Sequence, residues 1–157
     1  MRQGSMNSYL IVVGVDGSEG GRRALDWAVR EAASRGGTVR AVIAWSWDGL
    51  EYGPVTATGP DEAADRARQL LRREIDALAE RSGRTDEVTT EVFEGRPADV
   101  LAAAGATADM LVLGSHGHSR VRHTVLGSVS EDCIRKAACP VVVIPVPVAT
   151  PAGGRHD

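Results

Sequence analysis

Lysine is nearly absent from this sequence of 157 residues. Lys136 is the only lysine among 18 basic side chains, and the other 17 are arginines. A Walker-type P-loop needs Gly-Lys followed by Ser or Thr, because the lysine reaches the phosphates of the nucleotide. Lys136 stands between Arg135 and Ala137 instead. The sequence therefore excludes this form of phosphate binding.

Aromatic side chains and cysteines are also scarce. Only 4% of the residues are Phe, Trp or Tyr, too few for the stacking platforms that hold single-stranded nucleic acid. The formal net charge of −3 also argues against a nucleic-acid partner, which would require a basic surface. The two cysteines, Cys133 and Cys139, are too few and too badly spaced for a disulfide framework or a zinc site. Both are expected to have structural roles.

Long hydrophobic runs are missing as well. No apolar segment approaches the roughly 18 residues that a membrane span requires, and no secretory signal opens the chain. We therefore expect a cytoplasmic protein with no membrane partner. The composition, 43% hydrophobic and 25% charged, is typical of a globular protein, and the length is typical of one domain. We expect that domain at residues 8–148, with a flexible or artificially added N-terminus at 1–7 and a flexible tail at 149–157.

Strand and helix patterns alternate along this domain. The continuous apolar run Tyr9–Val15 predicts a strand that is buried on both faces of a parallel sheet. Ser18 is a typical N-cap for the helix that follows, and Gly36 and Gly37 end that helix. The alternation predicts a doubly wound α/β sheet. The remaining predictions are strands over Thr38–Trp45, Glu87–Glu94 (polar, at a sheet edge), Asp109–Gly114 and Pro140–Ile144, helices over Asp61–Ser82, Pro97–Ala104 and Ser130–Ala137, and a long loop over 46–60.

Two connections are placed to bind a ligand, because ligands of open α/β sheets bind beyond the carboxyl ends of the strands. The first is the turn 14–18, after the first strand, and the second is the segment 114–130, after the fourth. Gly114 and Gly117 permit backbone N–H groups to approach a ligand closely.

The second connection leads into a helix, and its end is suited to an anion. Gly127, Ser128 and Ser130 stand at the start of that helix, where unpaired N–H groups and the helix dipole attract negative charge. The two serine hydroxyls are further potential donors to a terminal phosphate. Each residue alone also has a structural alternative, since a glycine can end a strand and either serine can cap the helix.

The spacing of these residues resembles a known pattern. Gly, two residues, Gly, nine residues, Gly, Ser is the nucleotide-binding pattern of the universal stress protein family, and it falls here on Gly114, Gly117, Gly127 and Ser128. Roughly 0.03 such matches are expected by chance in a chain of this composition. Because the glycine pattern is intact, the sequence resembles the ATP-binding branch of the family.

The similarity extends beyond the glycines. The segments Ile11–Ser18 and Cys139–Pro145 resemble the first and last motifs of the family. The resemblance therefore covers the chain from about Tyr9 to Val146. It implies a Rossmann-like fold of the adenine nucleotide alpha hydrolase type, with a single five-stranded parallel sheet in the order 3-2-1-4-5. In that order the first and fourth strands are neighbours, and the two candidate connections meet over one crevice.

The resemblance also implies roles for individual residues. Asp16 is similar to the acid that hydrogen-bonds the nucleoside. Ala44 matches a position whose backbone meets the adenine edge, although the His-Val usual in the family reads Ile43-Ala44 here. The remaining implied contacts are Gly14 and Val15 beside Asp16, Leu113, Gly114 and Gly117 at the ribose and inner phosphates, and Gly127, Ser128, Val129 and Ser130 at the outer phosphates.

The function implied by the resemblance is that of an ATP-binding sensor or regulatory module of the stress response, with ATP bound together with Mg²⁺. The family also suggests a homodimer through the apolar edge strand Val141–Val146, and a signalling partner that the sequence does not identify. No catalytic residue is expected. A metal site is not expected either, because His116, His118 and His123 have no cysteine or carboxylate among them.

Three other functions remain open. An ATP hydrolase or nucleotide-transferring enzyme would need a base or a Mg²⁺-binding carboxylate near Ser128, where only Glu131 and Asp132 are close in sequence. A ligand-free interaction module would not need the glycines for binding. A flavin carrier is the weakest alternative, because few aromatic side chains are available to enclose the ring.

Overall fold

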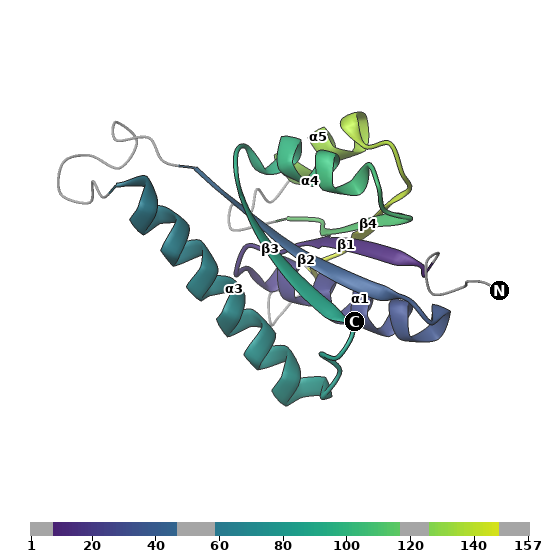
Figure 1. Ribbon diagram of the computed structural model, residues 1–157. Helices are drawn as coiled ribbons and strands as arrows, with labels where there is room; N and C mark the ends of the chain where they lie inside the picture. Colours follow the sequence, from purple (N-terminus) through teal and green to yellow (C-terminus); the bar gives the residue numbers. More distant parts are fainter. Residues whose placement is uncertain (1–7, 47–58, 117–125, 148–157) are drawn as a thin grey trace, which may run out of the picture.

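The computed structural model describes residues 8–46, 59–116 and 126–147, which form a five-stranded parallel sheet with helices on both faces (Figure 1). The strand order is β3-β2-β1-β4-β5, and every pairing is parallel, which confirms the predicted fold. The strands are β1 (Leu10–Gly14), β2 (Thr38–Trp45), β3 (Val88–Glu94), β4 (Met110–Gly114) and β5 (Val141–Ile144), and the helices are α1 (Glu19–Arg35), α3 (Pro60–Ser82), α4 (Pro97–Gly105) and α5 (Ser128–Lys136).

Several predictions fall outside the described residues. These are the N-terminal segment 1–7, most of the loop 46–60, the tail 149–157, and the site candidates Gly117, His118 and His123. Within the described ranges, none of the helices combines the length and the apolarity that a bilayer span needs.

Helix ends follow the sequence signals at α1 but not at α5. The side chain of Ser18 accepts a hydrogen bond from the N–H of Gly21 at 3.0 Å, and Gly36 ends the helix in a left-handed conformation with φ of 66°, as predicted. Helix α5 begins at Ser128, two residues earlier than predicted, and its N-cap is Gly127. Neither of the two serines near its start is therefore the cap.

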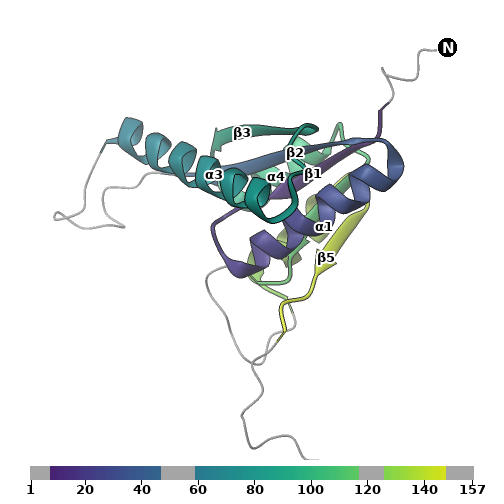
Figure 2. The ribbon, with the colours of Figure 1, turned by 90° about the horizontal axis from the view of Figure 1, so that it is seen from below.

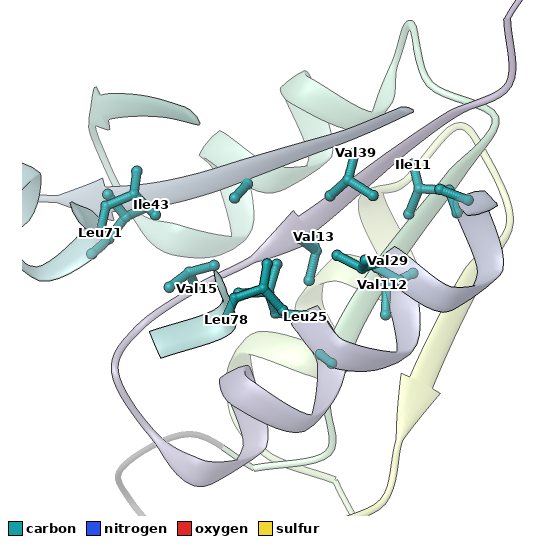
Figure 3. Close-up of a cluster of buried hydrophobic side chains, with 14 of the residues drawn as sticks. Ile11, Val13, Val15, Leu25, Val29, Val39, Ile43, Leu71, Leu78 and Val112 are labelled. Carbon is teal, nitrogen blue, oxygen red and sulfur yellow. The ribbon is translucent and has the colours of Figure 1, made fainter. Parts of the chain in front are cut away.

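The sheet separates two apolar layers, because side chains alternate between its faces. Helices α1 and α3 cover one face, and α4 and α5 cover the other (Figures 1 and 2). Figure 3 shows the larger layer, where Leu25 of α1 and Leu78 of α3 pack against Val13 of β1. The smaller layer contains Val12, Leu111 and other fully buried side chains, each of which contributes about 1.5–3 kcal/mol by leaving water.

The two edges of the sheet differ in character. β3 is one edge, and four of its seven residues are exposed, which confirms the prediction of a polar edge strand. β5 is the other edge, and its four residues are all apolar and only partly buried. The order of strands reverses between β1 and β4, so the connections that leave these two strands start side by side.

Candidate nucleotide site

A cavity of about 200 Å³ lies at the carboxyl ends of β1, β2 and β4, where the strand order reverses. It is bounded by the turn after β1, the end of β2, the end of β4 and the first turn of α5. Ten of the eleven predicted site residues line it, namely Gly14, Val15, Asp16, Ala44, Leu113, Gly114, Gly127, Ser128, Val129 and Ser130. The eleventh, Gly117, lies outside the described residues.

The carboxylate of Asp16 is held in one orientation by the start of α1. The backbone N–H of Ser18 donates to Oδ1 of Asp16 at 2.9 Å, and the hydroxyl of Ser18 donates to the same oxygen. Gly21 leaves the room for this arrangement, because a Cβ at that position would lie 2.8 Å from Oδ1. Ser18 therefore caps the helix and also positions the only carboxylate among the described residues that line the cavity.

An ion pair ties the same turn to α3. The Nη2 atom of Arg22 donates to the carbonyl of Gly17 at 2.9 Å, and its Nε lies 3.2 Å from a carboxylate oxygen of Glu74. The side chain of Glu74 is buried on α3. A buried carboxylate needs a paired partner, so this contact holds α3 and the turn at Asp16 together.

The end of β2 offers backbone groups rather than a side chain. The N–H of Val15 donates to the carbonyl of Val42 at 2.9 Å, so the backbone groups of Val42 point toward β1. Ala44, two residues further along β2, presents its N–H and C=O to the same side. The ladder between β1 and β2 ends at Gly14 and Val42, so the backbone of Ala44 faces the cavity beyond it.

The first turn of α5 has no side-chain cap. Its N-cap is Gly127, which has no side chain to accept a hydrogen bond from the helix. The hydroxyl of Ser130 donates to the carbonyl of Gly114 at 2.8 Å. The expectation that both serine hydroxyls donate to a phosphate is therefore wrong for Ser130, whose proton is used inside the fold. For Ser128, which lines the cavity, and for the backbone N–H groups of this turn, phosphate binding stays a prediction.

Gly114 is required for a different contact from the one expected. A Cβ at this position would lie 2.6 Å from the carbonyl carbon of Gly20 in α1. Real Cβ atoms do not approach backbone so closely, so alanine would push α1 away from β4. The glycine thus permits close packing of a helix on a strand, in addition to lining the cavity.

Sequence reasoning missed five lining residues, namely Gly21, Val42, Pro97, Leu101 and His116. Val42 had a usable signal, because it lies two positions before Ala44 and therefore on the same face of the strand. For Leu101 the only signal was the helical spacing of apolar residues, which predicts a buried position but does not distinguish a cavity wall from the core. Gly21 had no local signal, since its importance lies in a contact with Asp16.

Neither cysteine is poised for chemistry. Cys133 is fully buried, as predicted, and burial raises the pKa of its thiol to about 11. Burial also raises the pKa of Cys139. A thiol with a raised pKa carries little thiolate at neutral pH. Among the described residues, no group of three His, Cys, Asp or Glu side chains is arranged to hold a metal ion.

Comparisons with known proteins find relatives along most of the chain. The model of the universal stress protein family matches residues 10–145. Universal stress protein Rv2624c of Mycobacterium tuberculosis is 32% identical over 151 residues, which cover 96% of this chain and 53% of that protein. The chain thus spans about half the length of the curated relatives it matches.

Solved structures of the same family superpose on the fold. A universal stress protein in complex with cAMP matches at 26% identity and a TM-score of 0.61, over 87% of this chain and 95% of that one. A universal stress protein of Archaeoglobus fulgidus in complex with dAMP matches at 26% identity and a TM-score of 0.54, over 87% and 97%.

Proposed function

Because the chain belongs to the universal stress protein family, we propose that it binds an adenine nucleotide, specifically ATP, and acts as a nucleotide-dependent regulatory module in the stress response. The observation that carries this proposal is one cavity with two complementary ends. At one end a fixed carboxylate, Asp16, and the backbone of Ala44 offer hydrogen bonds to a nucleoside. At the other end, the first turn of α5 offers backbone N–H groups to phosphates.

The apolar wall between these ends supports the proposal. Val42, Leu101 and Leu113 line the cavity and also belong to the smaller apolar layer. Ligand pockets are commonly apolar with a few placed polar groups, which fits the flat face of a purine and the polar groups around it. The related structures that contain cAMP and dAMP show that this family accommodates adenine nucleotides in other members.

Magnesium would be coordinated mainly by the phosphates of the nucleotide rather than by protein side chains. Mg²⁺ prefers oxygen ligands and is commonly held by one or two carboxylates together with substrate phosphates. Asp16 is the only carboxylate among the described lining residues, and Ser18 already donates to it twice. When bound, the ion would neutralise phosphate charge. Ser128, in the first turn of α5, also lines the cavity, and its hydroxyl is an oxygen of suitable chemistry.

The same geometry favours binding over turnover. A hydrolase needs a base that can activate water beside the terminal phosphate. Near α5, Asp132 pairs with Arg135, and neither Glu131 nor Asp132 lines the cavity. We therefore propose that the chain is not a dedicated ATPase. A turnover above about one per second would favour the enzyme instead.

The variant V129E tests the phosphate end of the site. Val129 is the second residue of α5, lines the cavity and is 37% exposed. We expect nucleotide-stripped wild-type protein to bind Mg-ATP with micromolar affinity in isothermal titration. V129E is expected to lower that affinity about tenfold or more, because its carboxylate would repel the phosphates. Its stability should be unchanged or slightly higher, because an acidic residue suits the first turn of a helix.

The neutral variant V129Q is the matched control, since it has nearly the same shape without the charge. It should retain most of the affinity. A wild-type protein that binds none of ATP, AMP or a cyclic nucleotide would overturn the proposed function. Equal losses of Mg-ATP affinity in V129E and V129Q would mean that the volume of the side chain, and not repulsion of the phosphates, matters at this position.

We further propose that the chain forms a homodimer through β5. The N–H of Ser115 donates to the carbonyl of Ile144 at 2.9 Å, and the N–H of Leu111 donates to the carbonyl of Pro140 at 2.9 Å, so both carbonyls point toward β4. Because backbone groups alternate in direction along a strand, those of Val143 point away from the sheet. An apolar edge strand with free outward groups pairs readily with another chain.

V143P removes one outward N–H while leaving the β4–β5 hydrogen bonds in place, and proline is tolerated at edges. We expect it to raise the dimer dissociation constant about tenfold or more in analytical ultracentrifugation, whereas V143T keeps the N–H and stays dimeric. A dimer that is unaffected by V143P would place the interface elsewhere.

A further inference from the structure

Ser115, directly after β4, joins three parts of the fold that surround the cavity. Its N–H donates to the carbonyl of Ile144 at 2.9 Å, and its own carbonyl accepts from the N–H of Gly127 at 2.6 Å. Its hydroxyl oxygen accepts from the N–H of Val146 at 3.1 Å and lies 3.2 Å from Nδ1 of His116. The residue is only 4% exposed.

The buried hydroxyl of Ser115 favours one tautomer of His116. A backbone N–H can only donate, so the hydroxyl of Ser115 acts as an acceptor toward Val146. A buried hydroxyl proton also needs an acceptor. Among the hydrogen bonds of the described residues, Nδ1 of His116 is the group in position to accept it. Neutral His116 therefore has an unprotonated Nδ1 and carries its proton on Nε2.

His116 is also placed close to the phosphate end of the cavity. It lines the cavity, and its neighbour Ser115 is hydrogen-bonded to Gly127, the N-cap of α5. Its backbone carbonyl packs against α1, since a Cβ on Gly20 would lie only 2.2 Å from that oxygen. The backbone of His116 thus packs against α1, while Ser115 is hydrogen-bonded to Gly127 and contacts the Nδ1 edge of the ring.

We propose that His116 is a phosphate-binding residue, which Ser115 holds in the Nε2–H tautomer so that Nε2 donates to a phosphate oxygen of the bound nucleotide. This inference rests on the proposed function and goes beyond it by adding a side-chain donor to the backbone donors of α5. An Nε2–H group selects for ligand atoms that only accept hydrogen bonds, as phosphate oxygens do. Ser115 acts through His116 and is a positioning residue.

The binding test compares Mg-ATP with adenosine, which lacks phosphates. We expect H116A to weaken Mg-ATP about tenfold or more, the scale of one hydrogen bond to a charged group, while adenosine binding stays within about twofold. H116Q places an amide nitrogen near the position of Nε2 and should restore part of the affinity. H116N places its amide near Nδ1 instead and should not.

The positioning role of Ser115 has a spectroscopic test that needs no nucleotide. In ¹⁵N NMR of the full chain in alkaline solution, His116 should show a pyridine-type Nδ1 and a pyrrole-type Nε2. S115A should shift these nitrogens toward a mixture of tautomers. S82A is the matched control, because Ser82 also forms two hydrogen bonds to backbone, at the far end of α3.

The outcomes separate this inference from the proposed function. A wild-type protein that binds Mg-ATP while H116A binds it equally well would overturn the inference alone. Equal losses of Mg-ATP and adenosine in H116A would assign His116 a structural role. A pyrrole-type Nδ1 in the wild type would overturn the tautomer assignment even if no nucleotide binds, whereas failure of every nucleotide to bind the wild type would overturn the proposed function itself.

Discussion

G114A is expected to lower the free energy of unfolding by about 3 kcal/mol, at the upper end of overpacking effects in well-packed interiors. The added methyl group would lie 2.6 Å from the backbone of Gly20, which cannot rotate away as a side chain can. Helix α1 must therefore move, and with it the turn that holds Asp16. We expect Mg-ATP affinity to fall about tenfold or more. Urea unfolding and isothermal titration measure the two effects.

G83A is the matched control for this variant. Gly83 ends α3 with φ of 69°, and a Cβ there would meet no atom within 4 Å. Alanine should cost only about 1 kcal/mol for the left-handed backbone, and nucleotide affinity should not change. If G114A behaved like G83A in both measurements, the close approach of α1 to β4 would not persist in solution.

L101A is expected to destabilise the protein by about 3 kcal/mol and to weaken nucleotide binding as well. Leu101 of α4 is 5% exposed and belongs to the smaller apolar layer. Its truncation removes buried methyl groups and leaves a void, which typically costs 2–5 kcal/mol. Because Leu101 also lines the cavity, the void would widen the cavity and remove an apolar contact with the ligand.

L25A separates stability from binding. Leu25 of α1 is fully buried in the larger layer, on the opposite face of the sheet, and does not line the cavity. It should lose a similar amount of stability, measured by the urea midpoint, with unchanged affinity per folded molecule. Equal losses of affinity in L25A and L101A would show that global loosening, rather than the cavity wall, controls binding.

These contacts also bear on the alternatives that the sequence left open. A ligand-free interaction module has no need for a cavity with a carboxylate fixed by two hydrogen bonds at one end and a helix terminus without a side-chain cap at the other. A hydrolase needs a base near the outer phosphates. Of the described lining residues, Asp16 belongs to the nucleoside end in our proposal, and His116 donates a hydrogen bond to a phosphate in our inference. Regulatory binding of a nucleotide accounts for both features.

The sequence alone determined which segments are strands and helices, because that information is local. The buried run of β1, the Ser18 and Gly36 ends of α1 and the polar character of β3 all depend on residues that are neighbours in the chain. The strand order did not come from these patterns but from the resemblance to a family, and that resemblance also indicated most of the residues that line the cavity.

Only the tertiary structure decided what each of these residues does, because the deciding contacts join residues far apart in sequence. Gly114 packs against Gly20 of α1, the hydroxyl of Ser130 donates to the carbonyl of Gly114, and the hydroxyl of Ser115 accepts from the N–H of Val146. No local pattern contains these pairs. A sequence pattern can thus place a glycine or a serine at a site, but its partner in the fold decides whether it serves packing, positioning or the ligand.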